Sequence, residues 1–209
     1  MPIEFLISAL VTLLVVLDPV GISPTFLAIT DGLSDRYRRE VALRACLIAG
    51  AILIGAALIG DWLLRQLGIT LPAFRIAGGL LLFAVAAEMV LGLRQVRDSS
   101  TAEQAAEEHL HHMAAFPLAI PLLAGPGAIT AIILLAGQAA YRPVWLAVLC
   151  GVIVLAMAIC LLCLLAAEWL GKLLGVTGNV VLSRLLGVIL AALAVQYVID
   201  GARLAFGTS

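Results

Sequence analysis

The sequence predicts an all-α integral membrane protein with six transmembrane helices in two inverted-topology three-helix repeats, with helices 1 and 4 broken. Three observations lead to this prediction. Hydrophobic residues make up 64% of the chain and charged residues 12%, and the mean hydropathy is +1.18, which excludes a soluble domain with an ordinary polar surface. The second observation is an internal repeat, and the third is a pair of Pro- and Gly-rich interruptions inside apolar segments.

The internal repeat is a short pattern of residues that occurs once in each half of the chain. Its two copies are Asp61-Trp62-Leu63 with Leu67-Gly68-Ile69-Thr70, and Glu168-Trp169-Leu170 with Leu174-Gly175-Val176-Thr177, shifted by 107 positions. The same shift places Pro19 on Pro126, and a shift of 109 places Arg75-x-x-Gly78 on Arg184-x-x-Gly187. Each copy belongs to a unit of three apolar segments, so the second unit enters the bilayer from the opposite side. This arrangement is typical of secondary transporters.

Six apolar segments are long enough to cross a hydrocarbon core about 30 Å thick, which requires about 20 helical residues. The predicted spans are residues 4–29, 41–64, 71–93, 113–139, 144–170 and 180–206. The predicted units are 1–94 for the first repeat, 95–112 for a polar linker and 113–209 for the second repeat. All three His residues lie in the linker, where a solvated loop is favoured over a metal site.

Lys and Arg residues are concentrated on one side of the predicted membrane. The first, third and fifth connectors and the adjoining helix ends hold Arg36, Arg38, Arg39, Arg44, Arg94, Arg97, Lys172 and Arg184, while the other side holds Arg65, Arg75, Arg142 and Arg203. This bias predicts that the first set is cytoplasmic and that both termini are outside. The net charge of −1 and the lack of a long basic run argue against a nucleic-acid partner.

The two interruptions lie inside the first and fourth predicted spans. They are Asp18-Pro19-Val20-Gly21-Ile22-Ser23-Pro24, and Gly125-Pro126-Gly127-Ala128-Ile129-Thr130 following Pro117 and Pro121. Proline removes a backbone donor and glycine allows unusual backbone angles, so we expect each helix to break there. Lipid cannot bond the freed N–H and C=O groups. We therefore expect both breaks to be buried in protein or to line a polar cavity, and to meet near the midplane.

The breaks suit a small zwitterion. A half-helix starting after Gly21 or Gly127 would point N–H groups and partial positive charge at a carboxylate, while the freed carbonyls suit an ammonium or a cation. The alternative is a simple kink in two packed helices, and recurrence of the break at the repeat distance favours a site. The predicted substrate-binding residues are Asp18, Pro19, Gly21, Ile22, Ser23, Pro24, Gly125, Pro126, Gly127, Ala128, Ile129 and Thr130.

Asp18 is a carboxylate near the middle of an apolar segment, where a charge is costly and is tolerated mainly when paired, protonated or ion-bound. Asp followed by Pro is a strong helix-start signal, so Asp18 is predicted either to cap the half-helix beginning at Pro19 or to bind substrate or a coupling cation. The two roles are compatible. The candidate coupling ions are Na⁺ and the proton.

Four further polar residues are candidates for the pathway or for coupling. Arg75 and Arg184 either snorkel to the interface or face inward and compensate Asp18, Glu88 or a substrate carboxylate. Glu88 in the third span and Gln196 in the sixth either line the pathway or bond between helices, and for Gln196 the structural role is favoured. The sequence contains no H-E-x-x-H, G-x-S-x-G or P-loop pattern, so nothing in it indicates an enzyme.

Four motifs follow one another along the chain: Asp18-Pro19-Val20-Gly21-Ile22-Ser23-Pro24-Thr25-Phe26, Arg75-Ile76-Ala77-Gly78-Gly79, Pro117-Leu118-Ala119-Ile120-Pro121-Leu122-Leu123-Ala124-Gly125-Pro126-Gly127-Ala128-Ile129 and Ser183-Arg184-Leu185-Leu186-Gly187. In these motifs the chain resembles the MarC family of bacterial and archaeal inner-membrane proteins, also described as SnatA-type neutral amino acid transporters. The family's first motif often has Asn where this chain has Asp18, which leaves the coupling ion open.

The resemblance implies a carrier of glycine, alanine and other small neutral amino acids in the bacterial or archaeal cytoplasmic membrane. The substrate would lie between the two interrupted helices and its movement would be coupled to a cation. Alternating access would come from motion of one helix bundle against the other. The alternatives are an exporter of another small solute or ion and a non-transporting membrane scaffold. Lipid is the expected environment, and a homo-oligomer is left open.

Overall fold

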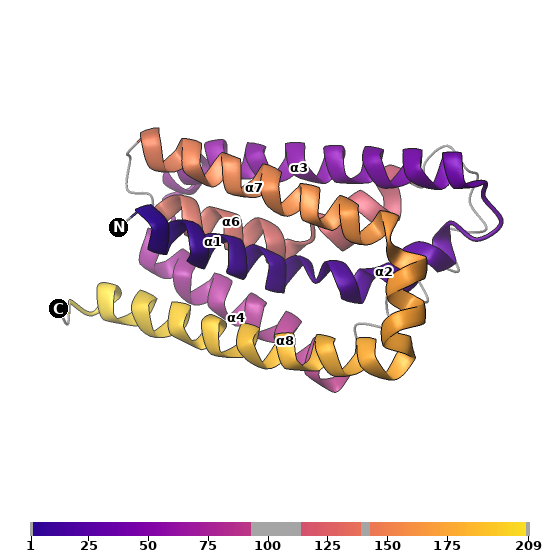
Figure 1. The fold of residues 1–209 in the computed structure, drawn as a ribbon. Coiled ribbons are helices and arrows are strands. Elements are labelled where there is room, and N and C mark those ends of the chain that lie inside the picture. The colour runs from indigo at the N-terminus through magenta and orange to yellow at the C-terminus, as the bar shows by residue number, and fades with distance from the viewer. Residues whose placement is uncertain (1, 93–113, 139–142, 208–209) are drawn as a thin grey trace.

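The structure is a computed structural model that describes residues 2–92, 114–138 and 143–207. Within these ranges the chain forms a bundle of helices and no strand (Figure 1). The elements are α1 (Pro2–Leu17), α2 (Pro19–Ile29), α3 (Asp35–Gln66), α4 (Leu71–Leu91), the π-helix η1 (Ala114–Leu123), α6 (Pro126–Gln138), α7 (Pro143–Leu165) and α8 (Ala167–Ala205). The predicted linker, residues 95–112, lies outside the described residues.

Five helical segments of the described chain are long and apolar enough to cross a membrane. They are Ile3–Ile29, Asp35–Gln66, Leu71–Leu91, Val144–Leu165 and Thr177–Ala205. The predicted fourth span is divided between η1 and α6, and α6 is too short to cross a membrane alone. Both ends of the described chain lie at one end of the bundle, and residues 30–34 turn at the opposite end (Figure 1).

The fifth predicted span, 144–170, ends earlier than the sequence indicated. α7 stops at Leu165, and the first part of α8 turns across the end of the bundle as far as Gly175 (Figure 1). This part carries the exposed side chains of Glu168 and Lys172. Two charged residues four positions apart lie on one helix face, which is stable at the membrane surface and costly inside lipid. The helix therefore leaves the membrane direction before these residues.

Gly175 forms the kink of α8, with φ 61° and ψ −179°. Gly68, its counterpart in the repeat, has φ 67° and ends the turn after α3. Left-handed backbone is open to glycine at little cost, so glycine at both positions explains why each repeat redirects the chain there. The sixth predicted span, 180–206, accordingly corresponds to Thr177–Ala205 in the structure.

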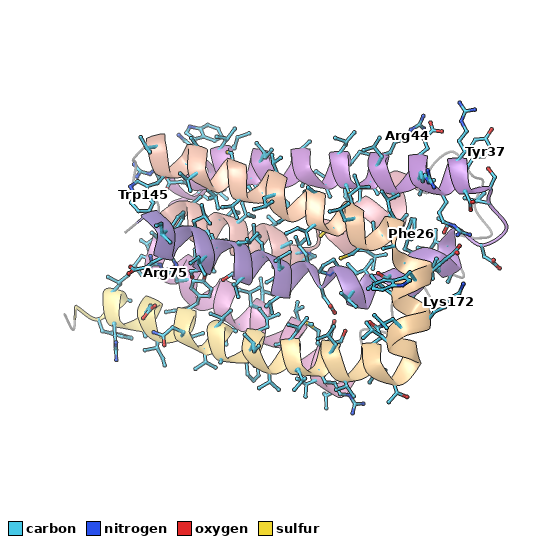
Figure 2. All side chains as sticks on the ribbon, in the orientation of Figure 1. Phe26, Tyr37, Arg44, Arg75, Trp145 and Lys172 are labelled. Carbon is cyan, nitrogen blue, oxygen red and sulfur yellow. The ribbon has the colours of Figure 1, made fainter. Side chains whose placement is uncertain are left out.

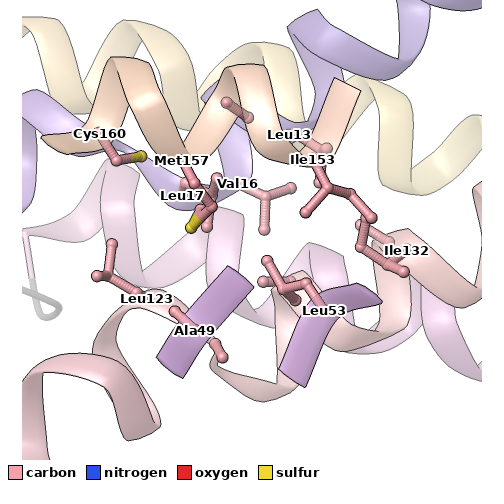
Figure 3. Close-up of a cluster of buried hydrophobic side chains, with 14 of the residues drawn as sticks. Leu13, Val16, Leu17, Ala49, Leu53, Leu123, Ile132, Ile153, Met157 and Cys160 are labelled. Carbon is pink, nitrogen blue, oxygen red and sulfur yellow. The ribbon is translucent and has the colours of Figure 1, made fainter. Parts of the chain in front are cut away.

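The apolar core lies between α1, α3, α6 and α7 (Figure 3). Its fully buried side chains include Leu13, Leu53, Ile132 and Ile153, one from each of these helices. α4 and α8 pack side by side along one flank of the bundle (Figure 1). Figure 2 places Arg44 and Lys172 at the end of the bundle opposite Trp145.

Glycines bring α4 and α8 close together. A Cβ added to Gly79 would lie 2.7 Å from the carbonyl oxygen of Ala194, and a Cβ added to Gly187 would lie 3.1 Å from that of Ala86. These separations leave no room for a side chain, so the two helices pack backbone against backbone. Such packing is typical of small residues at helix interfaces in membranes.

Candidate functional site

The first predicted break lies at Asp18, between α1 and α2. Asp18 has left-handed backbone angles, φ 46° and ψ 60°, and is the only described non-glycine residue with positive φ. Its N–H donates to the Leu14 carbonyl and its carbonyl accepts from the Ile22 N–H, both at 3.0 Å. Asp adopts this conformation more readily than most residues, so Asp18 keeps both of its own backbone hydrogen bonds at the turn.

The carboxylate of Asp18 joins the two halves of the protein. It accepts one hydrogen bond from the Gly21 N–H at 3.0 Å and another from the Ser183 hydroxyl of α8 at 2.8 Å. Asp18 is only 2% exposed and lies near the middle of the segment Ile3–Ile29. The helix N-terminus and two donors together stabilise a carboxylate at this depth.

The capping prediction for Asp18 is confirmed, since Asp18 is the N-cap of α2. This result corrects the expectation that a half-helix starts after Gly21 with N–H groups free for a substrate carboxylate. α2 starts at Pro19, and the Asp18 side chain already occupies its N-terminus. Gly21 is needed for this arrangement, because an added Cβ would lie 2.0 Å from Asp18 Oδ2 and 2.6 Å from Ser183 Oγ.

The second predicted break differs from the first in its chemistry. The Ala124 N–H donates to the Ala119 carbonyl at 2.8 Å, which closes the wide π turn of η1, and α6 starts at Pro126 rather than after Gly127. Gly125 stands where Asp18 stands in the first repeat, so no side chain caps α6. The two breaks come close together, because a Cβ added to Gly127 would lie 3.7 Å from Cγ1 of Val16.

Further along α6, Thr130 packs against α4. Its Cγ2 atom lies 2.6 Å from where a Cβ on Gly78 would stand. Ala128 and Thr130 are both buried. Thr130 therefore makes a close helix contact, whereas Pro126 is exposed. The cavity nearest the first break is built from other residues.

That cavity, called here the inner cavity, has a volume of about 140 Å³ and lies between α2 and α8. Its lining from α2 is Val20, Ser23, Pro24 and Leu27, and its lining from α8 is Ala167, Leu170, Gly171, Leu174, Gly175 and Asn179. The Ser23 hydroxyl donates to the Pro19 carbonyl at 2.9 Å. Buried Asn179 precedes Ser183 by one helical turn, so the cavity ends close to the Asp18–Ser183 hydrogen bond.

The two matched arginines lie in different surroundings. Arg75 is partly buried, its Cβ lies 3.0 Å from where a Cβ on Gly201 would stand, and its Nε is buried without a hydrogen-bond partner among the described residues. Figure 2 places it toward the end of the bundle that holds both termini. Arg184 is exposed, and its Nη2 lies 3.6 Å from a Cβ built on Gly92, the C-cap of α4. Arg75 thus faces inward and Arg184 faces outward.

The remaining candidates are Glu88 and Gln196. Glu88 is partly buried on α4. Gln196 is exposed and donates to Asp200 at 2.8 Å, one turn along the same helix. Gln196 therefore belongs to the surface of α8 and not to the inner cavity.

Sequence reasoning did not select Ser183 and Asn179 as site residues. Both are buried polar residues on α8, and their spacing of four places them on one face. This spacing is the sequence signal from which Asn179 and Ser183 could have been predicted. Buried Tyr197, within hydrogen-bonding reach of Thr12 and Gln138, was also missed and lies nearer the end of the bundle that holds the termini.

We expect Asp18→Ala to lower the free energy of unfolding by about 2 kcal/mol and Asp18→Asn to lower it much less. Alanine loses the cap, worth about 1 kcal/mol, and is strained by about 1–2 kcal/mol in left-handed backbone. Asparagine caps well and tolerates these angles. Equilibrium unfolding of the purified protein in detergent measures both variants, and equal losses would mean that the charge, rather than the cap, stabilises the break.

The fold and the site define a multi-pass helical membrane protein with a helix broken around a buried carboxylate. The chain belongs to the MarC family, since residues 3–206 match the family described as MarC family integral membrane protein. A UPF0056 membrane protein of Methanocaldococcus jannaschii is 37% identical over 204 residues, 97% of this chain and 98% of the relative. A UPF0056 membrane protein of Archaeoglobus fulgidus is 36% identical over 200 residues, 95% of this chain and 92% of the relative.

A third relative is the UPF0056 membrane protein YhcE of Escherichia coli, 33% identical over 193 residues, 90% of this chain and 87% of the relative. The family description and the names of these three relatives state a membrane location and no activity. No solved structure matches the chain.

Proposed function

We propose that the protein is a secondary transporter of small neutral amino acids such as glycine and alanine, coupled to Na⁺ or protons, and not an enzyme. The observation that carries this proposal is the Asp18 carboxylate, buried near the middle of a membrane span, at a helix break, and bonded to Ser183 of the other half of the chain. Ionisable residues at such depth commonly mark solute or ion pathways. Broken helices supply the binding groups in many secondary transporters.

The size of the inner cavity supports a small substrate. Its volume of about 140 Å³ is below the roughly 300–1,000 Å³ of sites for drug-sized ligands. The Ser23 hydroxyl and the Asn179 amide offer both donors and acceptors among apolar walls. A zwitterion with a short side chain fits this combination better than a large or strongly charged solute.

The proposed architecture is six crossings in two inverted repeats, residues 1–94 and 113–209. Reciprocal contacts support it, because Gly79 meets the Ala194 carbonyl and Gly187 meets the Ala86 carbonyl. Gly187 lies 108 positions after Gly79, and Ala194 lies 108 positions after Ala86. A two-fold axis between α4 and α8 would produce such a pair of contacts.

The proposed orientation places residues 30–34 in the cytoplasm and both termini outside. The Arg- and Lys-rich end of the bundle, which includes Arg44 and Lys172, is opposite the termini (Figure 2). The positive-inside rule assigns that basic end to the cytoplasm. The membrane is the cytoplasmic membrane of a bacterium or archaeon.

We expect proteoliposomes with the wild-type protein to accumulate labelled glycine or L-alanine when a Na⁺ or proton gradient is imposed. Ser183→Ala should lower the initial uptake rate about tenfold, since a hydrogen bond to a charged group contributes about 1.5–3 kcal/mol. Asp18→Asn should abolish the dependence on the gradient if this carboxylate couples the ion. The matched control is Ser8→Ala, at an exposed serine on α1, which should leave uptake unchanged.

Folded wild-type protein that moves no neutral amino acid under either gradient would contradict the proposal. Flux of a different solute would then favour the exporter, and the absence of any flux would favour the scaffold. Folding is checked by a single, symmetric peak in size-exclusion chromatography before reconstitution.

A further inference from the structure

A second cavity, called here the outer cavity, opens at the basic end of the bundle. It has a volume of about 320 Å³, and its charged lining is Asp35, Arg38, Arg39, Glu168 and Lys172. These residues come from the start of α3 and from the first part of α8. The outer cavity is therefore polar and lies where the chain meets the membrane surface.

The outer and inner cavities share one wall residue, Leu27 of α2. Ser23 lies one helical turn before Leu27, and Asp18 caps the start of the same helix. At 1.5 Å per residue, about 13 Å of helix separates Leu27 from Asp18. A solute passing Leu27 from the outer cavity would therefore meet Ser23 and Asn179 first and the Asp18–Ser183 pair next.

Within the described part of the chain, one ion pair spans the outer cavity. Arg38 of α3 pairs with Glu168 of α8, and both line the cavity. The Arg38 side chain is 21% exposed and the Glu168 side chain 59%, so the pair is partly solvated and can open at little cost. Its partners come from the two different halves of the chain, so it responds to movement of one half against the other.

The opposite end of the bundle is closed more firmly. A Cβ added to Gly201 would lie 2.9 Å from the Pro72 carbonyl oxygen, so α8 packs directly on the backbone of α4 there. Tyr197, one turn earlier, is 7% exposed, and Thr12 of α1 is 2% exposed. Opening this end requires whole helices to separate, whereas the contact that spans the outer cavity among the described residues is a partly solvated ion pair.

We propose that a small solute enters from the basic end, is bound by Ser23 and Asn179 in the inner cavity, and is gated by the Arg38–Glu168 ion pair with Leu27 as the inner barrier. This proposal rests on the proposed transport function and names its binding residues and its side of entry. Asn179 supplies the amide that orients the solute, and the apolar walls limit its size. Glu168 is a positioning residue that acts through Arg38.

The test is the accessibility of position 179 to a charged thiol reagent that does not cross membranes. Asn179→Cys is introduced after Cys46, Cys150, Cys160 and Cys163 have been replaced by alanine. The protein is placed in proteoliposomes, and the reagent is added to the basic side or to the terminus side. We expect labelling from the basic side only.

Adding Glu168→Gln should raise the rate of this labelling by a factor of up to about five, because a partly exposed ion pair contributes little stability to the closed state. Leu27→Trp should lower the labelling rate by at least the same factor, because the larger side chain blocks the passage between the two cavities. Glu40→Gln is the matched control, because it breaks the neighbouring Arg44–Glu40 pair, which does not line the outer cavity, and should leave the rate unchanged.

Labelling from the terminus side, or no change with Glu168→Gln and Leu27→Trp, would overturn the route and its gate. Because labelling needs no transported solute, the route is tested separately from the transport function. Expected labelling without amino acid flux would leave the route intact and remove the amino acid as its solute. Amino acid flux together with unchanged labelling rates in the variants would support the transport function and overturn the proposed route.

Discussion

Gly21→Ala should abolish transport and lower the free energy of unfolding by about 3 kcal/mol. The new Cβ would lie 2.0 Å from Asp18 Oδ2 and 2.6 Å from Ser183 Oγ, so the carboxylate must leave the position in which both donors reach it. Overpacking in a well-packed core costs about 1–3 kcal/mol, and losing a hydrogen bond to a charged group costs about 1.5–3 kcal/mol. Unfolding in detergent and uptake in proteoliposomes measure the two effects.

The control for this prediction is Gly55→Ala. A Cβ on Gly55 would meet nothing within 4 Å, and the residue lies inside α3. Alanine is more stable than glycine within a helix by about 0.5–1 kcal/mol, so Gly55→Ala should be neutral or slightly stabilising. A Gly21→Ala protein as stable and active as Gly55→Ala would mean that the Asp18–Gly21–Ser183 arrangement is not required.

Most of the first break could be predicted from sequence, because its causes are local. Asp before Pro starts a helix, and Gly21 provides the N–H that the carboxylate caps, all within four residues. The bond to Ser183 could not be predicted this way. It depends on the register between α2 and α8, and packing between residues 165 positions apart sets that register.

The repeat predicted matching positions but not matching surroundings. Arg75 and Arg184 correspond in sequence, yet one packs at Gly201 inside the bundle and the other lies exposed near Gly92. The contacts between α4 and α8 follow a shift of 108, whereas the arginines align at 109. A difference of one residue turns a side chain by about 100° around a helix, which is enough to move a guanidinium from the interior to the surface.

The first part of α8 shows a second limit of repeat-based prediction. Asp61 lies inside the continuous α3, while its counterpart Glu168 lies beyond the end of α7, on a segment that crosses the bundle. The two copies, 61–70 and 168–177, are identical at five of ten positions and conservatively replaced at three more, so their local propensities are similar. Glu168 pairs with Arg38, and this contact between the halves exists only with the segment turned across the bundle end.

Gly79→Ala and Gly187→Ala should each lower the free energy of unfolding by about 1–3 kcal/mol, the usual cost of overpacking. The added methyl of the first would lie 2.7 Å from the Ala194 carbonyl oxygen, and that of the second 3.1 Å from the Ala86 carbonyl oxygen. Both obstacles include helix backbone, which cannot rotate away as a side chain does. Gly79→Ala should have the larger effect because its contact is closer.

The double variant should lose less stability than the sum of the two single variants. Either methyl forces α4 and α8 apart, and once the helices have separated the second methyl meets less resistance. Gly171→Ala is the control on the same helix as Gly187, because a Cβ there would meet nothing within 4 Å. Equilibrium unfolding in detergent measures all four proteins under one condition.

A two-fold axis between α4 and α8 places both substitutions in the same interface. It therefore requires that each single variant loses stability to a similar degree and that the double variant loses less than the sum. Fully additive losses would mean that the two contacts are independent. A large loss from one glycine and none from the other would mean that the reciprocity of Gly79 with Ala194 and of Gly187 with Ala86 is coincidental. Either result would remove the main structural support for the inverted repeat, while leaving the Asp18–Ser183 site unaffected.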